Sequence, residues 1–89
     1  MKKINTLRKD IDQIHAQIFK LVLKRIKKSQ QIKKIKNKKK IKFVDPKRES
    51  ELIHMFDHKI KSDAQLKKMI QKIQKTILNE NKKYLNEKI

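Results

Sequence analysis

The sequence predicts an all-α protein with three helices, long, short and long, in a chain that associates as a homodimer. The 89 residues contain no glycine and a single proline, so tight turns between strands have few places to form. Apolar residues recur at helical spacing through most of the chain instead of alternating. A chain of this length forms one domain at most and buries only a thin core by itself. We therefore expect residues 1–89 to be a single domain that needs a partner copy.

The first predicted helix runs from about residue 5 to residue 40, a stretch without proline or glycine. Its apolar residues follow a heptad pattern. They are Ile4, Leu7, Ile11, Ile14, Ile18, Leu21, Ile32 and Ile35. A helix of about 35 residues is about 50 Å long, which is more than a small globule can cover with its own chain. It must pack against a partner chain, against other long helices, or both, and we interpret it as a dimerising helix.

The second predicted helix starts at an Asp-Pro pair. Asp45 has the residue type of an N-cap, and Pro46 suits the first helical position. We expect this helix over about residues 46–60, with three apolar residues facing inward. These residues are Leu52, Ile53 and Phe56.

A third helix is expected over about residues 63–87, after a tight connection. Ser62 and Gln65 have the spacing of a capping box at its start. Its apolar residues are Leu66, Met69, Ile70, Ile73, Ile77, Tyr84 and Leu85.

The formal net charge of +18 has two interpretations. One is an anionic partner, either nucleic acid or a small polyanion. The other is compositional drift, because an AT-rich coding sequence produces many lysines without selection on charge. Lysine accounts for 24 of the 27 basic residues, and under drift it replaces arginine wherever a generic positive charge suffices. The three arginines, Arg8, Arg25 and Arg48, are then the informative cations.

Arg25 occupies a heptad position that otherwise belongs to isoleucine, as steps of seven from Ile4 indicate. Lys36 lies eleven residues further on. It is on the same face of the helix, about 16 Å away along the axis. Two unpaired cations in an apolar seam are costly, so they indicate a bound anion. The alternative is that the helix end frays and both side chains extend into water.

Arg48 stands in the first turn of the second helix, where a cation opposes the helix dipole. Asp45 and Glu49 have an ordinary explanation there as capping and dipole groups. A guanidinium, however, suits bidentate binding of a carboxylate. Arg8 lies seventeen residues before Arg25, about 100° round the helix, and in an antiparallel or crossed dimer it reaches the Arg25 of the other chain. Together these cations predict a site for a small molecule with two carboxylates.

Other kinds of chemistry have little support. His54 and His58 have the spacing of a metal pair around Asp57, but no third ligand is evident, so no metal is expected. The chain has no cysteine for disulfide or thiolate chemistry, and its serines lack the glycine-framed turn of a nucleophile. No run approaches the roughly 18 apolar residues of a membrane span. The N-terminus lacks the apolar stretch of a secretory signal, so we expect a cytoplasmic protein.

The stretch from Leu7 to Glu49 resembles the all-helical class of chorismate mutases. The resemblance lies in "LRKDIDQIHAQIFKLVLKR", then Lys36, then "VDPKRE", in the order of the family pattern and without a gap. It is strong over roughly the first 55 residues and looser beyond them. It implies an intertwined dimer of three-helix chains with two active sites, each built from both chains. It also implies that the protein converts chorismate to prephenate in Phe and Tyr biosynthesis, by a Claisen rearrangement that needs no cofactor.

The resemblance implies a role for each matching residue. The matching residues are Arg8, Arg25, Lys36, Asp45, Arg48 and Glu49. The three arginines would hold the carboxylates of chorismate, with Arg8 acting from the partner chain. The lysine would donate to the ether oxygen of the breaking bond. The two acidic residues would bind the ring hydroxyl and position the neighbouring cations.

The family also has a glutamine late in the third helix that donates to the same ether oxygen. Alignment of "MIQKIQKTILNENKKYL" places Asn81 there and Ile77 one turn earlier. Asparagine is one methylene shorter than glutamine. A shift of one residue would instead place Glu80 there, with Thr76 one turn before it. The connection before this helix is also shorter than in the family.

Two other functions remain as alternatives. The charge of +18 suits a basic helical dimer that binds nucleic acid. Against this, aromatic residues make up only 4% of the chain, arginines are few, and no helix-turn-helix signature is visible. A purely structural coiled coil is the other alternative, against which Arg25 on the seam counts. Nucleic acid is therefore not the expected partner.

Overall fold

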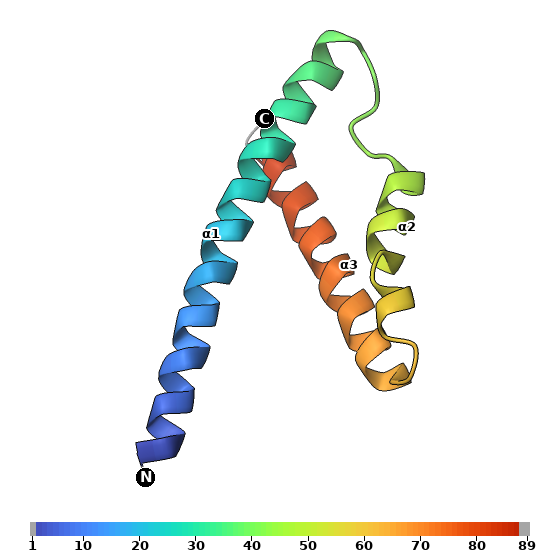
Figure 1. Ribbon diagram of the computed structural model, residues 1–89. Helices are drawn as coiled ribbons and strands as arrows, with labels where there is room; N and C mark the ends of the chain where they lie inside the picture. Colours follow the sequence, from blue (N-terminus) through green and yellow to red (C-terminus); the bar gives the residue numbers. More distant parts are fainter. Residues whose placement is uncertain (1, 88–89) are drawn as a thin grey trace. The chain divides into compact units, whose positions relative to one another are not determined.

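The computed structural model describes residues 2–87, and every regular element among them is helical (Figure 1). Helix α1 spans Lys2–Lys38, α2 spans Pro46–His54 and α3 spans Ala64–Glu87, and a short 3₁₀ turn, η1, spans Asp57–Lys59. The prediction of an all-α chain with a long, a short and a long helix is confirmed. The chain divides into two compact units, Met1–Lys39 with α1 and Lys40–Ile89 with the other elements.

Helix α1 ends where the backbone turns left-handed. It begins at Lys2 and ends at Lys38, so it starts and stops slightly earlier than expected. The Lys39 amide still donates to the Ile35 carbonyl at 3.1 Å, and Lys40 then takes a φ of 56°. Glycine usually takes this position because it has no Cβ. The chain has no glycine, so a lysine carries the steric cost of the left-handed conformation.

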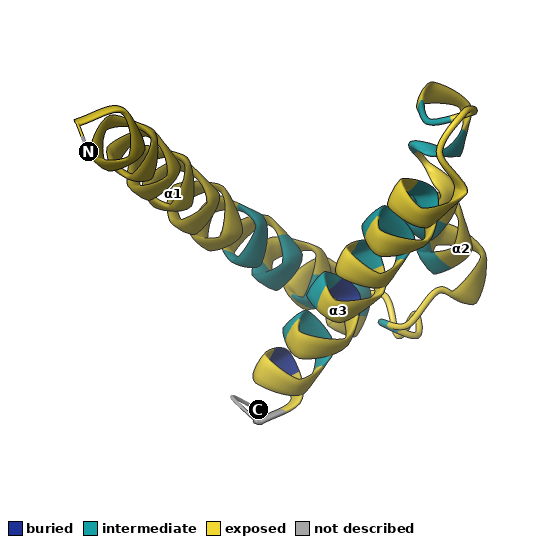
Figure 2. Ribbon diagram, turned by 90° about the horizontal axis from the view of Figure 1, so that it is seen from below, coloured by how far each residue is buried: buried dark blue, intermediate teal, exposed yellow. Residues whose placement is uncertain are grey.

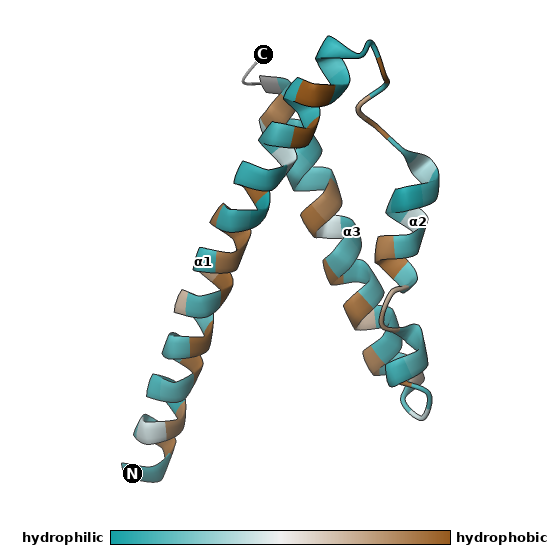
Figure 3. Cartoon of the chain, turned by 45° about the horizontal axis from the view of Figure 1, so that its top comes forward, coloured by the Kyte–Doolittle hydropathy of each residue, from teal (hydrophilic) through white to brown (hydrophobic). Residues whose placement is uncertain are grey.

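The heptad residues of α1 form an apolar stripe along one side of the helix (Figure 3). Their exposed fractions run from 44% at Ile4 to 64% at Leu21. No residue of α1 is buried. Long helices gain most of their stability by packing an apolar face against another surface, so this stripe requires a cover that α1 does not supply for itself.

Helix α2 begins as the sequence predicts and ends sooner. Asp45 Oδ1 accepts a hydrogen bond from the Arg48 amide at 3.2 Å, which makes Asp45 the N-cap, and Pro46 follows in the first helical turn. The helix stops at His54, not near residue 60. The Met55 amide then donates to the Leu52 carbonyl, and η1 follows with 3₁₀ spacing. The expected continuous helix is therefore wrong from residue 55 to residue 60, where tighter i to i+3 bonds replace helical ones.

Helix α3 is capped by Asp63. Asp63 Oδ1 accepts from the Leu66 amide at 2.9 Å, and the Asp63 carbonyl accepts from the Lys67 amide at 3.0 Å. The expected capping box of Ser62 and Gln65 is therefore wrong by one residue. Aspartate caps a helix as well as serine does, and its side chain takes the position here.

The core of the second unit lies where α2 packs on α3. Leu78 and Leu85 on α3 are 8% and 2% exposed, and they are the buried residues of the described part (dark blue in Figure 2). The three α2-side residues expected to face inward, Leu52, Ile53 and Phe56, are half-buried. This packing therefore fixes the side chains on the two helix faces that meet, one on α2 and one on α3.

Candidate active site

Arg25 and Lys36 share one face of α1. Both are half-buried, as is Lys33 between them, whereas Lys24 and Lys34 are exposed. The Arg25 Nη1 group donates to Ser29 Oγ at 3.5 Å, one turn further along the same face. The helix supplies this placement, because eleven residues correspond to about three full turns. The face carries two cations where an anionic ligand can meet both.

Arg8 lies on the same helix and is exposed. It is separated from Arg25 by seventeen residues, which is about 26 Å along a helix axis. A small dianion cannot span that distance. The structure therefore does not bring Arg8 and Arg25 of one chain together.

The first turn of α2 presents Arg48 and Glu49 in different surroundings. Arg48 Nη1 lies 3.2 Å from Glu51 Oε2, and both side chains are more than half exposed. Glu49 faces α3, where its Oε1 lies 3.1 Å from Lys82 Nζ, and the two side chains are 24% and 29% exposed. The Arg48 pair is a surface contact that contributes little free energy, so its loss would cost little.

Asn81 and Glu80 also differ in their surroundings on α3. Asn81 is half-buried, and its side-chain oxygen has almost no exposure to solvent. Glu80 is 67% exposed, and its Oε1 lies 3.7 Å from Lys83 Nζ. The same face of α3 as Asn81 carries Ile77 one turn earlier, also half-buried. Asn81 is thus on the packed side of α3 and Glu80 on the solvent side.

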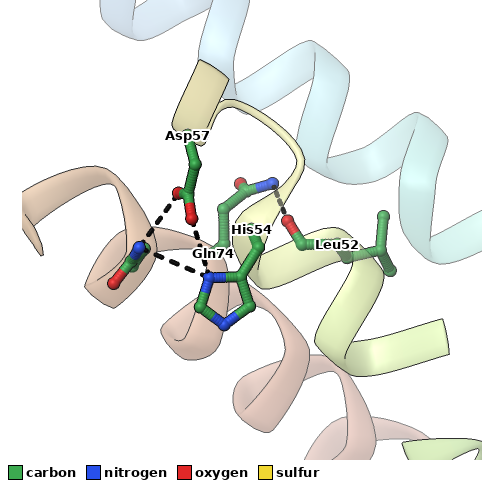
Figure 4. Close-up of polar contacts among 5 residues, drawn as sticks. Leu52, His54, Asp57 and Gln74 are labelled. Carbon is green, nitrogen blue, oxygen red and sulfur yellow. Dashed lines mark hydrogen bonds and ion pairs between the residues drawn. The ribbon is translucent and has the colours of Figure 1, made fainter. Parts of the chain in front are cut away.

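A second polar cluster joins the end of α2 to α3 (Figure 4). Asp57 Oδ1 accepts from Gln71 Nε2 at 2.9 Å, and Asp57 Oδ2 lies 2.9 Å from His54 Nδ1. One turn along α3, Gln74 Nε2 donates to the Leu52 carbonyl at 3.1 Å, which satisfies an acceptor in the last turn of α2. The hydrogen bond from Gln71, followed by that from His54, lowers the pKa of Asp57 below its ordinary value of 3.8. This cluster fastens two helices together.

The cluster does not make a metal site. The residues 2–87 contain no group of three or more His, Cys, Asp or Glu side chains placed to hold a metal ion. His54 and His58 are not one turn apart on a single α-helix, because α2 ends at His54 and His58 lies in η1.

Sequence reasoning missed Lys82, which forms an ion pair with the predicted site residue Glu49. It lies four residues after Leu78 and three before Leu85, the two buried residues of α3. A lysine at helical spacing between core leucines needs an anionic partner, and this was the signal that could have found it. Among 24 lysines, the position was lost in the general abundance of positive charge.

The chain was also compared with models of protein families. The model of the chorismate mutase type II family matches residues 7–86. The chain belongs to this family. Comparisons with curated proteins and with solved structures gave no match. Type II chorismate mutases are isomerases, so the chain is an enzyme that acts on chorismate.

The matched stretch of this chorismate mutase includes every predicted site residue, from Arg8 to Asn81, and also Lys82. It supports the mutase activity, and nothing supports the nucleic-acid-binding alternative. In residues 2–87, no helix is both long enough and apolar enough to span a membrane.

Proposed function

We propose that the chain converts chorismate to prephenate in aromatic amino-acid biosynthesis, in active sites shared between two copies of the chain. The family match over residues 7–86 is the observation that supports this reaction. The position of Arg25 and Lys36 on one face of α1 supports the choice of residues, because two cations eleven residues apart on a helix can meet the same anionic ligand. The reaction needs no cofactor and no metal.

The rearrangement is unimolecular, so the protein needs to do two things. It must hold a flexible dianion in the compact conformer that reacts. It must also stabilise the negative charge that develops on the ether oxygen as the C–O bond breaks. Arginine forks serve the first need, because each binds a carboxylate with two parallel hydrogen bonds. We assign Arg25, Arg48 and the partner subunit's Arg8 to this task.

A donor at the ether oxygen serves the second need, and we assign Lys36 to it. Asn81 supplies a second donor through its amide N–H, since an amide carries no charge that opposes the developing anion. Glu80 is the poorer candidate, because it is exposed and its carboxylate would repel that anion. Asp45 and Glu49 would accept a hydrogen bond from the ring hydroxyl and position the cations beside them.

The dimer is part of the proposal. Arg8 and Arg25 of one chain are too far apart for one substrate, so a site that uses both needs two chains. The exposed apolar stripe of α1 supports the same conclusion. A second apolar stripe on α3, formed by Leu66, Met69, Ile73 and Tyr84, is 38–52% exposed and adds to the surface that a second copy would cover. Such a dimer would have twice the 10.8 kDa mass of the chain, which light scattering measures directly.

The deciding experiment is an assay of the purified protein with chorismate, followed by the loss of its ultraviolet absorbance. Enzyme-catalysed loss with formation of prephenate supports the proposal, and its absence in a folded, dimeric preparation refutes it. We also propose a cytoplasmic location, which fractionation of the source cells with the same assay would test.

A further inference from the structure

The ion pair between Glu49 and Lys82 differs from the neighbouring ones. Its two charged atoms lie 3.1 Å apart, and the side chains are 24% and 29% exposed. The Arg48–Glu51 and Lys83–Glu80 pairs each lie within one helix, and their side chains are 51–70% exposed. The Glu49–Lys82 pair joins α2 to α3 across 33 positions of sequence. Because it is partly shielded from water, its geometry is more constrained than that of a fully exposed pair.

We propose that Lys82 is a positioning residue for chorismate binding: it holds one oxygen of Glu49 so that the carboxylate points its remaining acceptor capacity at the ring hydroxyl of the substrate. The inference rests on the proposed role of Glu49. A carboxylate has about four acceptor positions, so the bond from Lys82 to Oε1 leaves capacity for a hydroxyl. Without Lys82, the side chain of Glu49 would rotate among several rotamers. Part of the free energy of substrate binding would then be lost in ordering it.

The place of Lys82 on α3 supports a fixed role. It follows buried Leu78 by one turn and precedes buried Leu85 by one turn, a position where a lysine is costly unless it is paired. Lys68, Lys72 and Lys75 of the same helix are exposed, as expected of lysines that serve only for solubility. Lys83 is a matched control, because it is the next residue and its own ion pair with Glu80 is on the solvent side.

The kinetic signature follows from where the hydroxyl lies in the reaction. The hydroxyl takes no part in the bonds that break and form, so its contact has the same strength in the ground state and the transition state. Losing a contact of this kind raises KM and leaves kcat nearly unchanged. If the pair only fastened α2 to α3, its loss would lower the folded fraction, which reduces apparent kcat and leaves KM alone.

The test is a double-mutant cycle in steady-state kinetics with chorismate. We expect Lys82→Met to raise KM about tenfold with kcat within about twofold, as a lost charge-assisted hydrogen bond predicts. Lys82→Arg should restore KM to within about threefold, because it keeps the charge and a donor. Lys83→Met should match the unchanged protein. In a Glu49→Gln background, Lys82→Met should change KM by less than about threefold, because the carboxylate that it positions is gone.

Two results would overturn the inference. One is a Lys82→Met variant with unchanged KM, even if kcat falls together with the urea midpoint. The other is an equal effect of Lys82→Met with and without Glu49, which would mean that Lys82 acts on the substrate by itself. Failure of the proposed function gives different results: no turnover of chorismate by the unchanged protein refutes the reaction, and normal kinetics for Glu49→Gln refute the role of Glu49.

Discussion

Lys36 follows Arg25 by eleven residues on α1, so the two side chains start from one face of the helix, at backbone positions about 16 Å apart along its axis. The same face carries Ser29, which accepts a hydrogen bond from Arg25, and the apolar heptad residues Ile18 and Ile32. The proposed function explains the two cations by giving each a different atom of one dianion.

Substitution of Lys36 tests the donor at the ether oxygen. We expect Lys36→Ala to lower kcat by a factor of about 10² to 10³, the usual loss on removing one preorganised donor to a developing oxyanion. Lys34→Ala is the matched control, since Lys34 is exposed and two residues away, on the opposite side of α1. It should leave the rate of chorismate loss unchanged. A Lys36→Ala variant with near-normal turnover would contradict the assignment.

Mixing two inactive variants tests the shared site. Arg8→Ala and Arg25→Ala chains are each expected to be inactive as homodimers, because both of their sites lack one arginine. After unfolding and refolding together in equal amounts, about a quarter of the original activity should return, since half of the dimers are mixed and each mixed dimer has one intact site of two. The same mixture of Arg25→Ala and Lys36→Ala should stay inactive, because both residues come from the same chain in every site. Recovery in both mixtures, or in neither, would argue against this division of residues.

Substitution of Asn81 by a charged residue tests its proposed role as the second donor to the ether oxygen. We expect Asn81→Asp to lower kcat by about 10²-fold, because a carboxylate there repels the developing anion instead of donating to it. Asn81→Gln should keep or raise the activity, since it lengthens the donor by one methylene. Asn79→Asp is the control on the exposed side of α3 and should behave as the unchanged protein. If Glu80→Gln abolished turnover and Asn81→Asp did not, the one-residue shift would be the correct alignment.

Substitution of Lys40 tests the steric cost of the left-handed backbone conformation after α1. Lys40→Gly is expected to raise the free energy of unfolding by about 1 kcal/mol, because glycine adopts positive φ without a Cβ clash. Lys38→Gly, in the last helical position, should lower it by up to about 1 kcal/mol. Urea unfolding followed by circular dichroism measures both changes. A destabilised Lys40→Gly protein would show that the turn carries no steric cost.

The hydrogen bonds of Asp57 predict that the free energy of unfolding decreases in acid. The hydrogen bonds from Gln71 and His54 lower the pKa of Asp57 in the folded state. The ionised Asp57 side chain therefore stabilises the fold above its unfolded pKa. This stabilisation is lost as the pH falls through the folded pKa. The contribution is therefore present at neutral pH and declines below about pH 4. Asp57→Asn should lower the urea midpoint at neutral pH, and the difference from the unchanged protein should shrink as the pH falls through the folded pKa of Asp57. A difference between the two proteins that stays constant over this range would contradict the assignment.

The sequence alone predicted the features that depend on near neighbours. The heptads between Ile4 and Ile35 indicated the long first helix, and the Asp45–Pro46 pair indicated where α2 begins. Both are local signals, because periodicity and capping involve residues only three or four positions apart. Arg25, Lys36 and Arg48 were predicted in the same way, from local patterns, and Arg8 was predicted because arginine is rare in the chain.

Tertiary contacts decided the rest. α2 ends at His54, where Asp57 bonds to Gln71 and the Leu52 carbonyl to Gln74, both from α3, and no pattern within α2 contains that information. The same is true of Glu49, whose partner Lys82 is 33 residues away and is one lysine among 24. Which lysine is close enough to form that pair depends on how α2 packs against α3, and this packing exists only in the folded chain.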